Sequence, residues 1–168
     1  QLLLEQGKVI ADYDLRKEKI RKGVEAAAKE HKGIAVIDEN LLDEVASLNE
    51  WPVPLVGKFD DRFLEVPTEA LISSMKEHQK YFHMLDDTGA MMPNFITLAN
   101  IESKDPQQVI EGNERVIRPR LSDAAFFFET DKKTTLENRR EQLKKIVFQA
   151  KLGTVYDKTE RVAVLAGK

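Results

Sequence analysis

The chain has 168 residues, enough for one sizeable domain or two small ones. Hydrophobic residues make up 42% and charged residues 33%, which is typical of a globular protein and excludes a disordered one. The absence of cysteine excludes disulfides and thiolate metal sites and indicates a reducing, cytoplasmic setting. No apolar run reaches the ~18 residues that a membrane helix needs, so no membrane partner is expected.

The formal net charge of −3 is unevenly distributed. Residues 131–168 carry ten basic and five acidic side chains, whereas residues 1–65 and 66–130 are both acidic. One basic end is a weak signal for nucleic-acid binding, and a solvated helical surface explains these charges better. Since the first residue is Gln1 and the last segment reads as a helix, the chain is expected to be a piece of a longer protein.

Two helices are predicted near the beginning. The first runs from Asp14 to His31 and ends at Gly33. The second runs from Asp38 to Asn49, with Asp38 as its N-cap. Their buried positions are predicted to be Leu15, Ile20, Val24, Ala27 and Ala28 in the first, and Leu41, Leu42, Val45 and Leu48 in the second. Residues 38–50 include five acids and no base, so this surface should repel phosphate.

The centre of the chain has mixed α and β character. A short helix is predicted from Pro67, and its neighbours alternate in the manner of antiparallel strands. Asp86 to Gly89 reads as a turn whose glycine can take a positive φ. The predicted strands are 53–59, 63–66, 81–85 and 94–99.

From Asp105 onward the chain is predicted to be all helix. The first helix begins at Asp105-Pro106 and is interrupted by Pro119, because proline removes a helix hydrogen bond and clashes with the preceding turn. The further predicted helices are 120–129, 134–151 with a Thr134/Glu137 capping box, and 154–165 after Gly153. Phe126, Phe127 and Phe128 point in three directions, so neighbours should enclose them.

The predicted fold class is therefore α+β: a small mixed or antiparallel sheet with helices, followed by an all-helical C-terminal part. The predicted domains are an α+β part at 1–104 and a helical part at 105–168.

Motifs for catalysis are missing from the sequence. It has no phosphate loop, no HExxH and no nucleophile elbow. The histidines are His31, His78 and His83, and the latter two are a poor metal-ligand pair because they lie five apart across a helix-to-strand junction. No catalytic residue, metal site or cofactor is predicted for this chain.

The segment from Thr68 to Phe82 is the first candidate binding surface. Lys76 and Lys80 lie four residues apart on the predicted short helix, where like charges repel unless an anion lies between them. His78 shares a predicted face with Leu71 and Met75, which favours a packed histidine; contact with a nucleotide is the alternative.

A second candidate surface contains Arg115, Arg118 and Arg120. Arg115 follows Glu111 by four residues, so an intrahelical ion pair is its default explanation. Arg118 and Arg120 flank Pro119, where free N–H groups of a broken helix could hold phosphate. Asn113 lies in an apolar stripe and must be hydrogen-bonded, so it is predicted to tie its helix to the sheet.

These residues resemble the β subunit of the bacterial heterotetrameric glycyl-tRNA synthetase. The resemblance covers roughly residues 33–168 in long, idiosyncratic strings, while residues 1–32 fit without being diagnostic. The matching strings are LLDEVASLNEWPVPLVGKF at 41–59, FLEVPTEALISSMKEHQKYF at 63–82, PNFITLANIES at 93–103, GNERVIRPRLSDAAFFFETDKK at 112–133 and FQAKLGTVYDKTERV at 148–162.

The resemblance implies an activity for the complex and not for this piece. In the family, the α subunit holds the class II site that activates glycine with ATP, and the β subunit is required for tRNA binding and charging. Residues 1–104 look like the part similar to the editing module of the phenylalanine enzyme's β subunit. Residues 105–168 look like the start of a helical domain related to His-Asp phosphohydrolases. The implied partners are tRNA(Gly), the α subunit and the remaining β-subunit domains.

Three functions follow as hypotheses. The leading one is a non-catalytic, tRNA-contacting and structural segment of a glycine–tRNA ligase, with contacts from Lys76, His78, Lys80, Arg115, Arg118 and Arg120. The alternatives are a hydrolytic editing-like domain acting on misacylated tRNA, and a pure inter-subunit scaffold.

Overall fold

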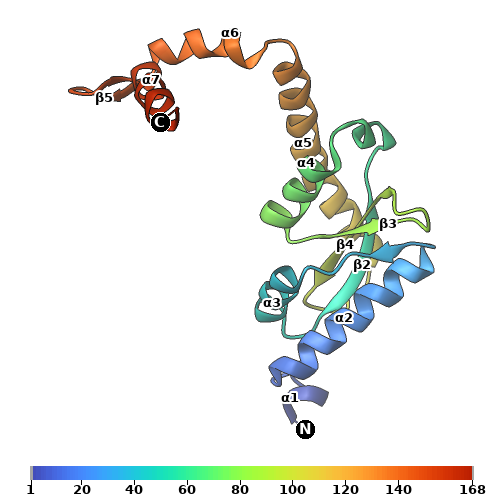
Figure 1. The fold of residues 1–168 in the computed structure, drawn as a ribbon. Helices are drawn as coiled ribbons and strands as arrows, with labels where there is room; N and C mark the ends of the chain where they lie inside the picture. Colours follow the sequence, from blue (N-terminus) through green and yellow to red (C-terminus); the bar gives the residue numbers. More distant parts are fainter. Residues whose placement is uncertain (1, 168) are drawn as a thin grey trace. The chain divides into compact units, whose positions relative to one another are not determined.

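The computed structural model describes residues 2–167 and contains two compact units (Figure 1). Unit 1 comprises residues 1–125 and unit 2 residues 126–168. The boundary between them falls inside helix α5, Pro106–Lys132. The α+β class predicted from the sequence is confirmed. The domain division at 104/105 stays a prediction.

The first two long helices form as predicted, each with an aspartate cap. Helix α2, Tyr13–Glu30, begins after Asp12, whose side chain accepts the N–H of Leu15. Helix α3, Glu39–Leu48, begins after Asp38, whose side chain accepts the N–H of Leu41. A short helix α1, Leu2–Glu5, precedes them.

The sheet of unit 1 has four antiparallel strands in the order β1-β3-β4-β2. The strands are β1 Ile34–Ala35, β2 Val53–Lys58, β3 Phe82–Leu85 and β4 Met91–Ala99. The turn between β3 and β4 has Gly89 at φ 84°, and Asp86 accepts the N–H groups of Thr88 and Ala90. The sequence predicts this turn, which sets the register in which β4 returns along β3.

One face of this sheet packs against α2 and α3 (Figure 1). Ile96 on β4 lies opposite Val56 on β2 and Phe82 on β3, so the three side chains point to the same side. The buried cluster on this side is Ile20, Val24, Ala28, Leu41, Leu42, Val45, Ala46, Phe82, Met84 and Ile96. Two predicted core positions are wrong, because Leu15 and Leu48 are 59% and 62% exposed.

The other face of the sheet is centred on Phe95. Its ring stacks on Tyr81 with centroids 4.5 Å apart and 14° between planes. Gly57 lies opposite Phe95 in the ladder, and a Cβ there would lie 2.4 Å from the ring. Tyr81 donates its hydroxyl to Asn113 of α5 at 2.6 Å. The predicted tie between Asn113 and the sheet region is therefore confirmed.

Two predictions in the centre of the chain are wrong. Residues 63–66 are not a strand: the turn η1, Asp61–Glu65, is a 3₁₀ helix. Asp60 caps it by accepting the N–H of Arg62, and this local bond outweighs the β-like side chains. The predicted short helix is present as α4, Thr68–Ser73, but it continues as a π-helical turn η2, Ser74–Gln79.

Helix α5 runs through Pro119 without interruption, so the predicted break is wrong. Proline removes one N–H donor, but the residues around it remain held by burial. Ile117 and Leu121, on one face of the helix, are both fully buried in unit 1. We infer that this anchoring outweighs the single lost hydrogen bond.

Unit 2 is helical except for one small hairpin. Helix α6, Leu136–Arg140, is followed by the 3₁₀ turn η3, Glu141–Lys145, and then by β5, Val147–Gln149. The hairpin is completed by β6, Gly153–Thr154, before helix α7, Val155–Ala166. The predicted helix 134–151 is thus wrong beyond residue 145, because Gly153 at φ 81° allows the chain to turn back.

The predicted start is wrong for α6 and nearly right for α7. Thr135, not Thr134, caps α6. Helix α7 begins with a capping box between Thr154 and Asp157, close to the predicted start. Phe126 and Phe127 are 64% and 61% exposed, so the prediction that neighbours enclose them is wrong within the described chain.

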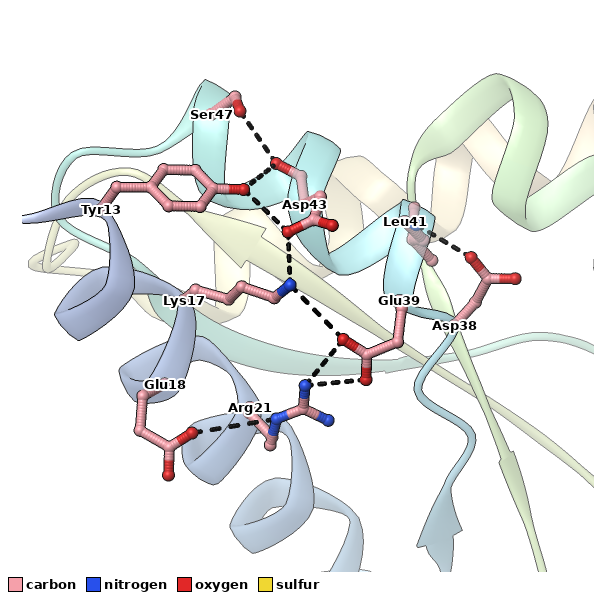
Figure 2. A network of polar contacts seen from close by, with 9 residues as sticks. All are labelled: Tyr13, Lys17, Glu18, Arg21, Asp38, Glu39, Leu41, Asp43 and Ser47. Carbon is pink, nitrogen blue, oxygen red and sulfur yellow. Dashed lines mark hydrogen bonds and ion pairs between the residues drawn. The ribbon is translucent and has the colours of Figure 1, made fainter.

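A network of ion pairs holds α2 against α3 on the surface of unit 1 (Figure 2). Lys17 lies 2.5 Å from Asp43 and 3.4 Å from Glu39, and Arg21 donates to Glu39 at 2.7 Å. Tyr13 also donates its hydroxyl to Asp43 at 2.8 Å. The bond from Lys17 lowers the pKa of Asp43, and the bond from Arg21 lowers the pKa of Glu39.

This network predicts a specific acid sensitivity. Because both carboxyl pKa values are lowered by folding, their contribution is present above about pH 4 and is lost as pH falls below it. Lys17→Met should therefore flatten the fall in unfolding free energy between about pH 5 and pH 3. Urea unfolding followed by the fluorescence of Trp51, the sole tryptophan of the chain, measures this. Lys29→Met, on the exposed side of α2, should leave the pH profile unchanged.

Within residues 2–167 no helix is both long enough and apolar enough to cross a membrane.

Candidate nucleic-acid interface

The two lysines of the first candidate surface are held by carboxylates of α3 and of its N-cap residue. Lys76 lies 2.7 Å from Asp38, and Lys80 lies 2.9 Å from Glu44. The bond to Asp38 raises the pKa of Lys76, and the bond from Lys76 lowers the pKa of Asp38. The two like charges are therefore balanced by acids of the protein itself, and a phosphate would have to compete with both.

His78 is exposed, so the prediction that it packs with Leu71 and Met75 is wrong. The reason is the winding of η2. A π-helical turn has more residues per turn than an α-helix, which rotates His78 away from the buried Met75. The turn ends at Lys80, which takes the left-handed conformation with φ 60°.

The three arginines of α5 have no carboxylate partner within residues 2–167, and all three are exposed. The ion pair predicted between Arg115 and Glu111 does not form; Glu111 instead accepts a hydrogen bond from Gln107 at 3.1 Å. Free, exposed guanidinium groups can bind phosphate bidentately. In this respect α5 differs from the α4–η2 segment.

The arginines do not share one face of α5. At about 100° per residue, Arg115 and Arg118 lie on neighbouring rows, whereas Arg120 lies about 160° from Arg118. Arg118 and Arg120 flank Pro119 in a continuous helix, so the predicted phosphate cradle of a broken helix is absent there. The arrangement brings together Arg115 and Arg118 and points Arg120 elsewhere.

A hollow of about 650 Å³ lies beside Arg118 in unit 1. Its walls come from the end of β2, the η1 turn and α5. The lining residues are Lys58, Phe59, Asp60, Asp61, Arg62, Phe63, Glu114 and Arg118. We refer to it below as the Arg118 hollow.

Two cations of this hollow, Lys58 and Arg62, are not predicted from the sequence. Lys58 and Arg62 lie more than 50 residues before Arg118, and neither belongs to a recognised motif. Residues 38–65 also contain many acids, which hides a basic group in any composition window. The aspartate cap at Asp60 was a usable signal, because a capped turn after a strand fixes where Arg62 projects.

The buried titratable groups of unit 1 lie near the sheet, not in a cluster with metal-binding geometry. Burial raises the pKa of Tyr81 to about 12 and lowers the pKa of His83. Within residues 2–167 no group of three or more histidine, aspartate or glutamate side chains is placed to hold a metal ion.

Exposed guanidinium groups without a carboxylate partner are free to bind a phosphate or carboxylate group. The family model described as glycyl-tRNA synthetase beta subunit matches residues 1–168. The chain therefore belongs to the glycyl-tRNA synthetase β-subunit family.

Individual relatives of this chain carry the same family name. The chain is 69% identical to the glycine–tRNA ligase beta subunit of Marinobacter nauticus, over 99% of this chain and 24% of that protein. It is 70% identical to that of Hahella chejuensis, over 96% and 23% respectively. It is 58% identical to that of Yersinia pestis, over 99% and 24%. The chain spans about a quarter of the length of these curated relatives.

Proposed function

We propose that this chain is a tRNA-contacting and structural segment of a glycine–tRNA ligase β subunit, working in the cytoplasm. It would support the charging of tRNA(Gly) at an ATP-dependent active site on the α subunit. The supporting observation is the state of Arg115, Arg118 and Arg120, which are exposed and have no carboxylate partner within the described chain. Family membership supplies the whole-enzyme activity, since the relatives are named as ligase subunits.

Within this proposal the candidate residues differ in availability. Arg115 and Arg118 can contact a phosphate without losing an existing partner. Lys76 and Lys80 must first leave Asp38 and Glu44, so their contribution should be smaller. His78 is exposed between these lysines and can reach a nucleotide only if that surface is used.

The test replaces Arg115→Gln and Arg118→Gln in the full-length β subunit assembled with the α subunit. We expect the Michaelis constant for tRNA to rise about tenfold or more, with a shallower dependence of affinity on salt. Formation of glycyl-adenylate should be unchanged, because it requires no tRNA. Arg120→Gln, tested singly, reports whether the far side of the helix also takes part.

A matched control removes the same charge elsewhere. Lys22 is 74% exposed on α2, and Lys104 is exposed before α5. The variant Lys22→Gln/Lys104→Gln should leave the Michaelis constant for tRNA within about twofold. A normal tRNA constant in the arginine variant would remove the support for a tRNA contact on α5.

A scaffold role is favoured for unit 2 by its exposed apolar side chains. Within the described chain, the large hydrophobic residues of unit 2 that are more than 60% exposed are Phe126, Phe127, Leu136, Val147, Val164 and Leu165. So much apolar surface in one small unit is typical of a region covered by a partner. Slower hydrogen exchange of β5 and α7 in the full complex than in the 168-residue chain would support this role.

A further inference from the structure

The lining of the Arg118 hollow carries three cations and three carboxylates, and two of the cations have no ion-pair partner within residues 2–167. Lys58 and Arg118 have no side-chain partner within residues 2–167, and Arg62 reaches Asp60 only at 3.7 Å while 65% exposed. Of the acids, Glu114 accepts the backbone N–H of Lys58 at 2.9 Å, and Asp60 accepts that of Arg62 at 3.0 Å. Asp61 alone has no bond in the described chain.

The same bonds fix the positions of the cations. Glu114 and Arg118 lie four residues apart and share a face of α5, which would ordinarily pair them. Because Glu114 is turned toward the end of β2, Arg118 is left without a carboxylate. This bond also fastens α5 to the strand from which Lys58 projects.

The floor of the hollow is packed and apolar. Phe59 and Phe63 are 8% and 3% exposed, and the backbone N–H of Phe59 donates to Pro93 at 2.9 Å. The guanidinium of Arg62 lies 4.9 Å from the centre of the Phe63 ring, a cation–π contact that restricts its orientation. Basic groups from β2, η1 and α5 therefore line one hollow, together with the carboxylates of Asp60, Asp61 and Glu114.

We propose that the Arg118 hollow binds a single phosphate group of an RNA backbone, held jointly by Lys58, Arg62 and Arg118. This inference rests on the proposed contact between α5 and tRNA, and it extends that contact to two residues outside α5. A hollow with a fixed floor binds one phosphate at a defined place, which would set the register of the RNA along α5. The Asp61 carboxylate repels any anion, an RNA phosphate included, so the three cations must outweigh it.

The experiment measures binding of tRNA(Gly) to the full-length β subunit assembled with the α subunit, across a range of salt concentrations. Lys58→Gln/Arg62→Gln should weaken binding about tenfold and reduce the salt slope by one to two. The control Lys22→Gln/Lys104→Gln should change neither. Lys58→Arg/Arg62→Lys keeps both charges and should retain most of the affinity, which separates charge loss from misfolding.

A double-mutant cycle tests whether one phosphate is shared. If Lys58 and Arg118 hold the same group, the effect of Arg118→Gln should shrink at least threefold in a Lys58→Gln background. Simple additivity of the two effects would reject a shared site.

The outcomes separate the two proposals. Normal binding by Lys58→Gln/Arg62→Gln, with weakened binding by Arg115→Gln/Arg118→Gln, overturns the hollow and leaves the α5 contact standing. Normal binding by both variants overturns the two proposals together. Weakened binding by both, with non-additivity in the cycle, supports both.

Discussion

Phe95→Ala is expected to lower the free energy of unfolding of unit 1 by about 3–5 kcal/mol. The ring is fully buried on β4 and stacks on Tyr81. Tyr81 in turn donates its hydroxyl to Asn113, so the ring supports the contact between the sheet and α5. Loss of the ring would leave a cavity that the surrounding ladder of β2, β3 and β4 can close only in part.

Urea unfolding of the 168-residue chain, followed by the fluorescence of Trp51, measures this loss. Leu15→Ala provides the control, because Leu15 is 59% exposed on α2 of the same unit. Its truncation should cost less than about 1 kcal/mol. Equal losses for the two variants would mean that Phe95 is not part of the core of unit 1.

A substitution at Gly57 tests the packing against Phe95 from the neighbouring strand. Its Cβ would lie 2.4 Å from the Phe95 ring, so Gly57→Ala should destabilise unit 1 by about 1–3 kcal/mol. In a Phe95→Leu background the obstructing ring is gone, and the added methyl group should cost much less. Persistence of the full cost there would assign the effect to the strand backbone and not to the ring.

The predictions that are confirmed concern caps and turns, whose structure is determined by residues close together in the sequence. The cap of α3 and the start of α7 depend on hydrogen bonds between neighbouring positions, and their residue types predict them. The same holds for the turn at Gly89, where only the local conformation matters. The antiparallel pairing of β3 and β4 followed from that turn.

The wrong predictions concern segments whose structure depends on contacts or backbone winding that the local sequence does not reveal. Nothing local reveals that Ile117 and Leu121 are buried deeply enough to carry the helix through Pro119. The π-helical winding of η2 does not appear in a pattern of about 100° per residue, which predicts His78 on the buried side of the helix. Residues 147–151 are predicted to be helical because a short hairpin has too few residues to show alternation.

Only part of the candidate site can be predicted from the sequence, because the rest depends on contacts between distant residues. Arg115, Arg118 and Arg120 form a cluster along the chain, so composition alone found them. Their freedom from carboxylates depends on what Glu111 and Glu114 contact, and that required the fold. Lys58 and Arg118 line the same hollow because a hydrogen bond from the backbone N–H of Lys58 to Glu114 holds the end of β2 against α5.

Ile117→Ala is expected to lower the free energy of unfolding of unit 1 by about 2–4 kcal/mol. Its neighbour Val116 is 46% exposed, so Val116→Ala should cost less than about 1 kcal/mol. The pair tests whether burial of one face of α5 holds the helix through Pro119. Urea unfolding with Trp51 fluorescence reports the stability, and hydrogen exchange of residues 113–121 reports α5 directly. Similar losses for both variants would mean that the helix is not anchored by this face.

The burial of Ile117 also affects the position of Arg118. Arg118 lies one residue after Ile117 and about 100° round the helix from it, so its position depends on that anchor. If α5 loosens, Arg118 loses its fixed position beside Lys58, and part of the affinity for RNA goes with it. Ile117→Ala should therefore weaken tRNA binding without changing the salt slope by as much as Arg118→Gln does, because no charge is removed. A full loss of slope in the Ile117 variant would mean that the contact with RNA requires the whole helix to be seated, and not the arginine alone.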